Sequence, residues 1–165
     1  MVRVTLQAVR VDLQSNTPVL LLQESDGEGR TLPIFIGTPE ATAIAYATQG
    51  IEVPRPLTHD LLVDVVEALD ASIREVEITS LEGSTFYAEL HLVRGGEDII
   101  VSARPSDAVA LAVRTSCPLY VSESIMNSEG VVMDLDDDGD EVEEEVVVDQ
   151  FREFLDTIQP EDFSG

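Results

Sequence analysis

Alternating hydrophobic and polar positions near the start of the chain predict a run of short strands. Residues 2–13 alternate, residues 17–24 contain the apolar run VLLL, and residues 31–37 read TLPIFIG. The connecting segments SNTP and ESDGEG are rich in turn-forming residues. The sequence therefore predicts three strands, with a hairpin turn at ESDGEG.

Two helical patterns follow these strands. The segment ATAIAYAT comes after Thr38, Pro39 and Glu40, an order typical of a helix cap, a proline at the first helical position and an acid near the positive helix end. A second helix is predicted from Thr58 to about Leu69, because its apolar residues recur every three or four positions: Leu61, Leu62, Val65, Val66 and Leu69.

The pattern of three strands and a helix then occurs a second time. SIREVEITS, TFYAELHLV and DIIVSAR read as strands, and PSDAVALAVRT reads as an alanine-rich helix capped by Ser106. Subtracting 40 from 107 gives an offset of 67 residues, which aligns Glu40 with Asp107 and TLPIFIG with DIIVSAR. Chance similarity between alanine-rich helices is the alternative. We predict an α+β fold made of a duplicated unit of three strands followed by one or two helices.

This pattern divides the chain into three parts. Residues 1–130 form a compact two-layer domain that ends in CPLYVSESIM, a short strand with a helical turn. Residues 131–145 are an acidic linker, and residues 146–165 are an amphipathic C-terminal helix and tail with apolar residues at helical spacing. The linker and helix could also regulate access to a site on the domain.

The amino-acid composition says more about the protein's environment than about its activity. The chain has 165 residues, 33 Asp and Glu, nine arginines and no lysine, which gives a net charge of -24. Repulsion of this size is screened at molar salt, where the Debye length is about 3 Å, so the composition resembles that of haloarchaeal proteins. An acidic tail is the competing explanation. The single cysteine and the lack of a long apolar run predict a cytoplasmic protein that does not enter a membrane.

The two alanine-rich helices are apolar nearly all round. Such helices are typically covered by a sheet on one side and by another helix or subunit on the other. We therefore expect a homo-oligomer, a dimer or larger.

Candidate chemistry lies at three helix starts: TPE at 38–40, RPLTHD at 55–60 and RPSD at 104–107. Helix N-termini bind phosphate, and an adjacent arginine adds two parallel donors. Carboxylates can hold a divalent cation such as Mg²⁺ or Mn²⁺, and histidine transfers protons near neutral pH. The candidate catalytic residues are Glu40, His59, Asp60, Ser106 and Asp107, and the candidate phosphate-binding residues are Arg55 and Arg104.

A purely structural interpretation competes with this assignment. Thr38, Thr58 and Ser106 are good helix caps, and acids in a first helical turn stabilise the helix dipole without any catalytic role. His59 gains nothing from the positive end of a dipole, which favours a site role for it. His91, on an alternating strand, is expected at the surface. The sequence of this region contains no phosphate-binding glycine loop or nucleophile elbow.

These stretches resemble the bifunctional nuclease domain family. The resemblance covers about residues 1–130 in order and rests on LPIFIGTPEATAIA at 32–45, RPLTHDLL at 55–62, TFYAEL at 85–90 and SARPSDAVALAVRTSCPLYVSE at 102–123. The final FREFLDTIQPEDF also resembles the tail of some prokaryotic members. The resemblance implies a compact α+β domain with a duplicated unit, self-association, and the hydrolysis of RNA and DNA that the family name describes, chiefly for plant members.

Two functions therefore stay open. One is a metal-assisted nuclease that hydrolyses RNA, DNA or both, binding nucleic acid at high salt. The other is a noncatalytic oligomeric protein that uses the same groove for an acidic ligand or a protein partner. Convergence of the three helix starts in space would favour the nuclease, and separate, individually satisfied caps would favour the binding protein.

Overall fold

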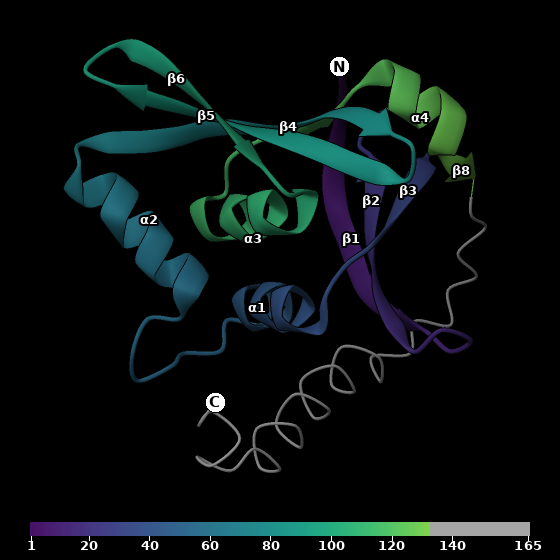
Figure 1. Cartoon of the computed structure of the whole chain (residues 1–165), viewed down its shortest axis with the longest axis horizontal. Helices are drawn as coiled ribbons and strands as arrows, with labels where there is room; N and C mark the ends of the chain where they lie inside the picture. The colour runs from purple at the N-terminus through teal and green to yellow at the C-terminus, as the bar shows by residue number, and fades with distance from the viewer. Residues whose placement is uncertain (133–165) are drawn as a thin grey trace.

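A computed structural model describes residues 1–132, which form one eight-stranded sheet and four helices (Figure 1). The predicted α+β class is confirmed. The predicted C-terminal helix and almost all of the acidic linker lie outside the described residues. Val131 and Val132 form a short strand, β8, that pairs with β3. None of the helices within the described part is long and apolar enough to cross a membrane.

Each half of the domain begins with three antiparallel strands. In the first half these are β1 (Val2–Asp12), β2 (Thr17–Glu24) and β3 (Arg30–Phe35). In the second half they are β4 (Ala71–Glu82), β5 (Thr85–Arg94) and β6 (Glu97–Ala103). All six strands predicted in these two regions are thus confirmed.

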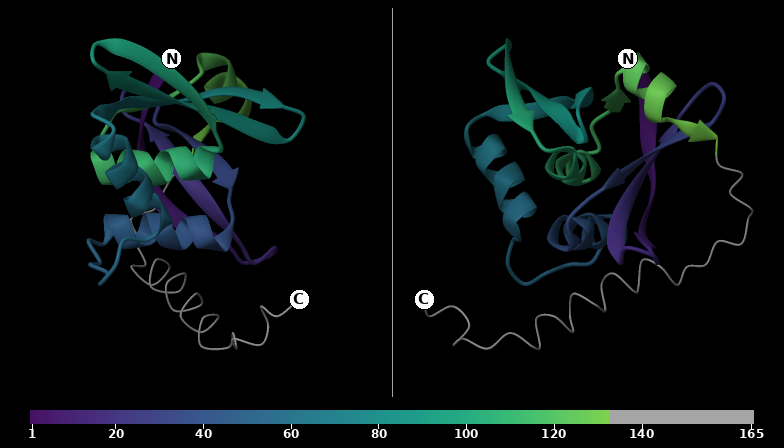
Figure 2. Two further views of the ribbon diagram at one scale, coloured as in Figure 1. Left: turned by 60° about the vertical axis from the view of Figure 1, so that its left-hand side comes forward. Right: turned by 45° about the vertical axis from the view of Figure 1, so that its right-hand side comes forward.

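The short strand β7 (Leu119–Val121) joins the two halves into one sheet. It pairs antiparallel with β1 and parallel with β4, which gives the strand order β6-β5-β4-β7-β1-β2-β3-β8. Figure 2 shows the sheet curving around the central helices, with β4, β5 and β6 on one side and β1, β2 and β3 on the other. The two halves therefore enclose a shared core.

The helices follow the duplicated order of the strands. They are α1 (Thr38–Thr48), α2 (Thr58–Ala68), α3 (Pro105–Thr115) and α4 (Glu123–Glu129). Subtracting 38 from 105, or 48 from 115, gives 67, so both ends of α1 and α3 coincide under the predicted offset. α1 and α3 pack against each other inside the curved sheet. The repeat in the sequence is therefore a repeat in the fold.

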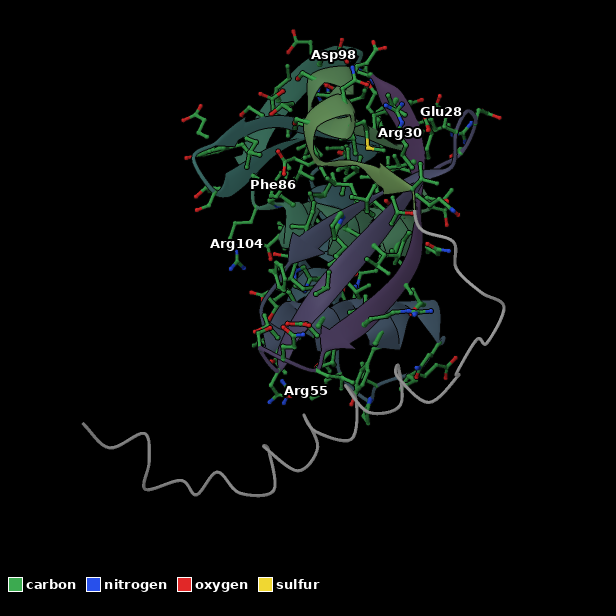
Figure 3. All side chains as sticks on the ribbon, turned by 90° about the vertical axis from the view of Figure 1, so that its right-hand side faces the viewer. Glu28, Arg30, Arg55, Phe86, Asp98 and Arg104 are labelled. Atoms are coloured by element: carbon green, nitrogen blue, oxygen red, sulfur yellow. The ribbon has the colours of Figure 1, made fainter. Side chains whose placement is uncertain are left out.

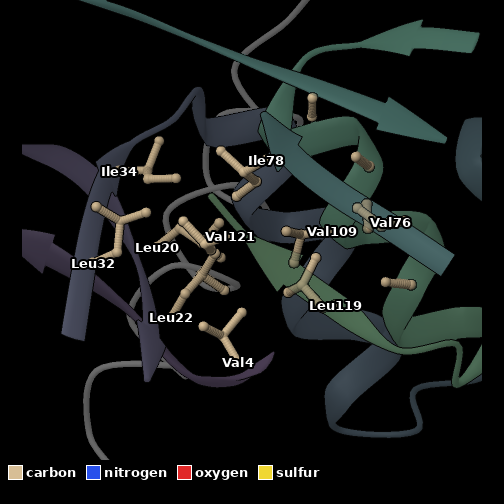
Figure 4. Close-up of a cluster of buried hydrophobic side chains, with 14 of the residues drawn as sticks. Val4, Leu20, Leu22, Leu32, Ile34, Val76, Ile78, Val109, Leu119 and Val121 are labelled. Atoms are coloured by element: carbon tan, nitrogen blue, oxygen red, sulfur yellow. The ribbon is translucent and has the colours of Figure 1, made fainter. Parts of the chain in front are cut away.

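The core lies between the concave face of the sheet and these two helices. Alternate strand residues such as Leu20, Leu22 and Ile78 are fully buried there, and Val109 of α3 packs among them (Figure 4). Burial of large aliphatic side chains stabilises a domain by about 1.5–3 kcal/mol for each side chain. This core fixes α1 and α3, and with them the positions of their first turns.

The helix caps differ from those predicted. The cap positions are Gly37, Leu57 and Arg104, none of which makes a side-chain cap hydrogen bond, so the prediction of Thr38, Thr58 and Ser106 as caps is wrong. At α2, the Asp60 carboxylate accepts a hydrogen bond from the Leu57 backbone N–H at 2.9 Å. This acid thus stabilises the helix start from inside the first turn, without a hydroxyl cap.

Candidate functional site

The starts of α1, α2 and α3 meet at one pocket. The pocket has a volume of about 520 Å³ and is open to solvent on one side. Its lining comes from all three starts: Pro39, Glu40, Thr42, Ala43, Pro56, Leu57, Thr58, His59, Arg104 and Asp107. Segments that are far apart in the sequence therefore place acids, a histidine and an arginine around the same space.

Arg104 joins two acids that are equivalent in the duplicated unit. Its Nε donates to Asp107 Oδ2 at 2.7 Å, and its Nη2 donates to Asp107 Oδ1 at 3.0 Å and to Glu40 Oε1 at 2.7 Å. The Arg104 side chain is nevertheless 65% exposed. Its third nitrogen, Nη1, donates no hydrogen bond to any residue in 1–132. This arrangement leaves a cationic donor facing solvent at the pocket.

Gly37 makes the position of Glu40 possible. A side-chain carbon at Gly37 would overlap the Oε2 atom of Glu40. The carboxylate of Glu40 can therefore lie back over the start of α1, where it is largely covered and reaches Arg104. The glycine has an ordinary negative φ of -76°, so its role here is the close approach and not backbone freedom.

His59 is the second partner of Asp107. Its Nε2 lies 3.0 Å from Asp107 Oδ1, and its side chain is 11% exposed. A carboxylate bonded to one ring nitrogen fixes the imidazole in one orientation and leaves Nδ1 as the other functional nitrogen. The pair has the geometry of an acid that orients a proton-transferring histidine.

The electrostatics keep Asp107 ionised. Burial raises the pKa of Asp107, but the hydrogen bonds from Arg104 and His59 outweigh burial and hold it below its ordinary value. The same bond to Asp107, together with the bond to Glu40, raises the pKa of Arg104. With His59 neutral, the two carboxylates and one guanidinium give the pocket lining a charge of -1, and protonation of His59 brings that charge to zero.

Asp60 points away from this group and into a separate ion pair. Arg114 Nε donates to Asp60 Oδ1 at 2.5 Å, and the other two nitrogens of Arg114 donate to the carbonyls of Ala110 and Ala43. Burial raises the pKa of Asp60, and the bonds from Arg114 and the Leu57 N–H more than offset it, so the pKa is lowered. The Asp60–Arg114 pair joins the start of α2 to α3 and α1.

The two remaining candidates lie outside the pocket lining. Ser106 is buried in the first turn of α3. Arg55 is exposed in the loop before α2 and makes no hydrogen bond or ion pair with a described residue. Figure 3 shows Arg55 and Arg104 projecting from separate places on the surface. The structure thus brings together Glu40, His59, Asp107 and Arg104.

Sequence reasoning missed Arg114. It is the basic residue in the last turn of α3, where the available signal was a single arginine after an apolar run. Its side chain is 9% exposed, and no local pattern indicates which carboxylate it pairs with. Such a buried arginine requires a partner, which only the packing of α2 on α3 supplies.

Potential metal ligands gather elsewhere. Among residues 1–132, one group of three His, Asp or Glu side chains brings its ligand atoms within 4.8 Å of one another, and it consists of Glu77, Glu89 and His91. His91 was expected at the surface, but its side chain is only 13% exposed, because carboxylates from β4 and β5 surround it. The predicted cation at Glu40, Asp60 and Asp107 stays a prediction.

Comparison with known proteins places these features in a family. Residues 20–134 match the bifunctional nuclease domain. Two uncharacterized proteins from two strains of Mycobacterium tuberculosis are each 46% identical over 159 residues, which cover 95% of this chain and 94% of the relatives. Bifunctional nuclease 2 of Arabidopsis thaliana is 28% identical over 115 residues, covering 68% of this chain and 35% of the plant protein.

Proposed function

Because this chain belongs to the bifunctional nuclease domain family, we propose that it is a nuclease that hydrolyses phosphodiester bonds in RNA, DNA or both. The observation that carries the proposal is the contact between His59, Asp107, Arg104 and Glu40 in one pocket. Bifunctional nucleases 2 and 1 of Arabidopsis thaliana, which are 28% and 27% identical to this chain over 115 and 117 residues, support it at the level of the family.

In this proposal Arg104 binds the phosphate group. A guanidinium donates charge-assisted hydrogen bonds to phosphate oxygens, and Nη1 of the exposed Arg104 side chain, which has no partner among residues 1–132, is available for one such contact. Glu40 and Asp107 hold the other two nitrogens and so fix the plane of the guanidinium. Positive charge at this point stabilises the negative charge that develops on phosphate oxygens in the transition state.

His59 moves the proton in this proposal. When Nε2–H donates to Asp107, Nδ1 is the basic nitrogen that can accept a proton from an attacking water molecule. Ionised Asp107 stabilises the imidazolium that forms. A general acid–base group of this kind contributes about 100- to 10,000-fold to a reaction rate.

The proposal includes a divalent cation at the acids of the pocket. Glu40 and Asp107 offer oxygen ligands of the kind that Mg²⁺ and Mn²⁺ prefer. Arg104 already occupies both carboxylates, so a cation would compete with the guanidinium for them. Asp60 is engaged by Arg114 and would join only if that pair opened. Cleavage in the presence of EDTA would show that the reaction needs no cation.

The experiment is cleavage of labelled single-stranded RNA and DNA in molar KCl, with Mg²⁺, Mn²⁺ or EDTA. We expect His59→Gln to lower kcat/KM at least 100-fold and Arg104→Gln to lower it at least tenfold. Arg94→Gln removes one arginine from the distant β5–β6 hairpin and should cleave like the wild type. Thermal unfolding of each variant confirms that it is folded.

The other outcomes favour specific alternatives. Equal cleavage by the wild type and His59→Gln would indicate a contaminant or a different site. If no protein cleaves either substrate, the second candidate function is favoured: a noncatalytic oligomeric protein that binds an acidic ligand or a protein partner. Arg104 supports that candidate. Glu40 and Asp107 already pair with two of its nitrogens, and the remaining nitrogen, Nη1, can bind a carboxylate or phosphate without any reaction.

A further inference from the structure

A second cluster of ionisable side chains lies on the opposite face of the sheet. Val76 and Ile78 of β4 are fully buried on the helix side, so Glu77 between them points to the other face. On β5, Glu89 and His91 alternate with the buried residues Ala88 and Leu90 in the same way. The cluster is therefore separated from the pocket by the thickness of the sheet.

The strand register places like charges directly opposite each other. Glu77 pairs with Glu89 across β4 and β5, and like charges in this position are destabilising by a few tenths of a kcal/mol or more. Neither carboxylate makes a hydrogen bond with any residue in 1–132. The third acid of this face, Glu75, is different because Arg74 binds it at 3.0 Å. Glu77 and Glu89 thus lack a cationic partner other than His91.

The residues directly opposite the cluster on β6 and β7 carry no positive charge. On β6, Ser102 is opposite Glu89 and Ile100 is opposite His91. On β7, Tyr120 is opposite Glu77. A cation bound between the two carboxylates would relieve their repulsion.

The distances fit a metal ion better than a hydrogen bond. His91 Nε2 lies 3.5 Å from Glu77 Oε2 and 3.6 Å from Glu89 Oε2. The Nε2 atom is buried and has no hydrogen-bond partner, and N–H···O bonds are typically shorter, about 2.7–3.2 Å. In a tetrahedral zinc site with ligands about 2.1 Å from the metal, neighbouring ligand atoms are about 3.4 Å apart. Both distances from His91 Nε2 therefore match the spacing of neighbouring ligands, and the ligand atoms of all three residues lie within 4.8 Å of one another.

We propose that Glu77, Glu89 and His91 bind a divalent transition-metal ion, with Zn²⁺ as the best match and water as the fourth ligand. Imidazole nitrogen with carboxylate oxygen is a donor set that zinc accepts. The ion would join β4 to β5 on the outer face of the sheet. This site does not depend on the nuclease proposal, because it shares no residue with the pocket.

The test is titration of the metal-stripped full-length protein with Zn²⁺ in buffered 0.5 M KCl, followed by isothermal calorimetry. We expect one saturable site in the wild type and at least tenfold weaker binding in both His91→Gln and Glu89→Gln. Glu82→Gln removes one exposed carboxylate from the same strand as Glu77 and should bind like the wild type. Two ligand variants are used so that the site can be judged even if one of them fails to fold.

Three results would overturn the proposal. One is the absence of saturable binding in the wild type, which would mean that His91 only separates the two carboxylates. The second is equal binding by the wild type, Glu89→Gln and His91→Gln, which would indicate diffuse attraction to an acidic surface. The third is loss of the site in His59→Gln, which would place the ion in the pocket instead.

Discussion

Replacing Asp60 with asparagine removes the charge partner of a guanidinium that the protein has almost entirely buried. The side chain of Arg114 is 9% exposed and that of Asp60 is 32% exposed. Removing one member of a buried ion pair costs about 3–5 kcal/mol, because the other charge stays buried without a partner. Since solvent reaches part of Asp60, we expect a smaller loss than this, about 2–3 kcal/mol in the free energy of unfolding.

The assay is urea unfolding followed by circular dichroism, with thermal unfolding alongside. A loss of this size in a domain of this length corresponds to a Tm lower by about 8–12 °C. Asp64→Asn is the matched control, because Asp64 lies one turn later on α2, is exposed and carries the same charge. An unfolding free energy of Asp60→Asn within about 0.5 kcal/mol of the Asp64→Asn value would refute the structural role of the pair.

The same variant separates a structural role from a catalytic one. If Asp60 is catalytic, as the sequence suggests, Asp60→Asn should lose cleavage while its stability stays near that of the wild type. If it only holds α2, activity should return when the assay is run well below the lowered Tm. A double-mutant cycle with Arg114→Met gives the coupling energy directly, and a value near zero would contradict the contact.

Three further predictions concern pH, salt and assembly. The pKa values of Asp60 and Asp107 are lowered on folding. Their stabilising effect is therefore complete above the ordinary pKa of 3.8 and is lost as the pH falls through the lower folded values. Acid unfolding of Asp107→Asn should consequently depend less on pH than acid unfolding of the wild type. Raising KCl from about 0.1 to 2 M should increase Tm, because salt screens the net charge of -24, and a constant Tm would contradict halophilic adaptation. We also propose that the exposed apolar residues of α2 mediate self-association. The double variant Leu62→Glu, Val65→Glu should then have a lower mass by light scattering than the wild type. An unchanged mass would point to another surface.

The elements were predictable because each follows from local periodicity. The alternation in residues 2–13 predicts β1, and the structure confirms this strand. The helix after Thr58 is confirmed too, although four of the five apolar residues that predicted it are exposed: Leu61, Leu62, Val65 and Leu69. The offset of 67 residues was also visible, since duplicated elements keep duplicated patterns. The order of the strands in the sheet was not predictable from the sequence, because β7 lies between β1 and β4 through long-range pairing that no local sequence pattern indicates.

The helix caps show where local rules fail. Thr38 and Ser106 have the residue types preferred at caps, yet the cap positions lie one and two residues earlier, at Gly37 and Arg104. At Gly37 the requirement is room for the carboxylate of Glu40, which a side chain would displace. Residue preference at the cap position does not register this contact with a residue three positions away.

The site depends on a difference between the two copies of the repeat. Under the offset, Glu40 is equivalent to Asp107, and Gly37 is equivalent to Arg104. The packing of α1 against α3 brings both acids to one place. Arg104 binds Asp107 three positions along the chain and Glu40 64 positions away, while its counterpart Gly37 makes room for Glu40. Two copies with an arginine at this position would place two cations beside two acids, and two copies with glycine would leave two carboxylates unpaired. The divergence of one repeat position is therefore what turns a pair of ordinary helix starts into a pocket with one exposed guanidinium.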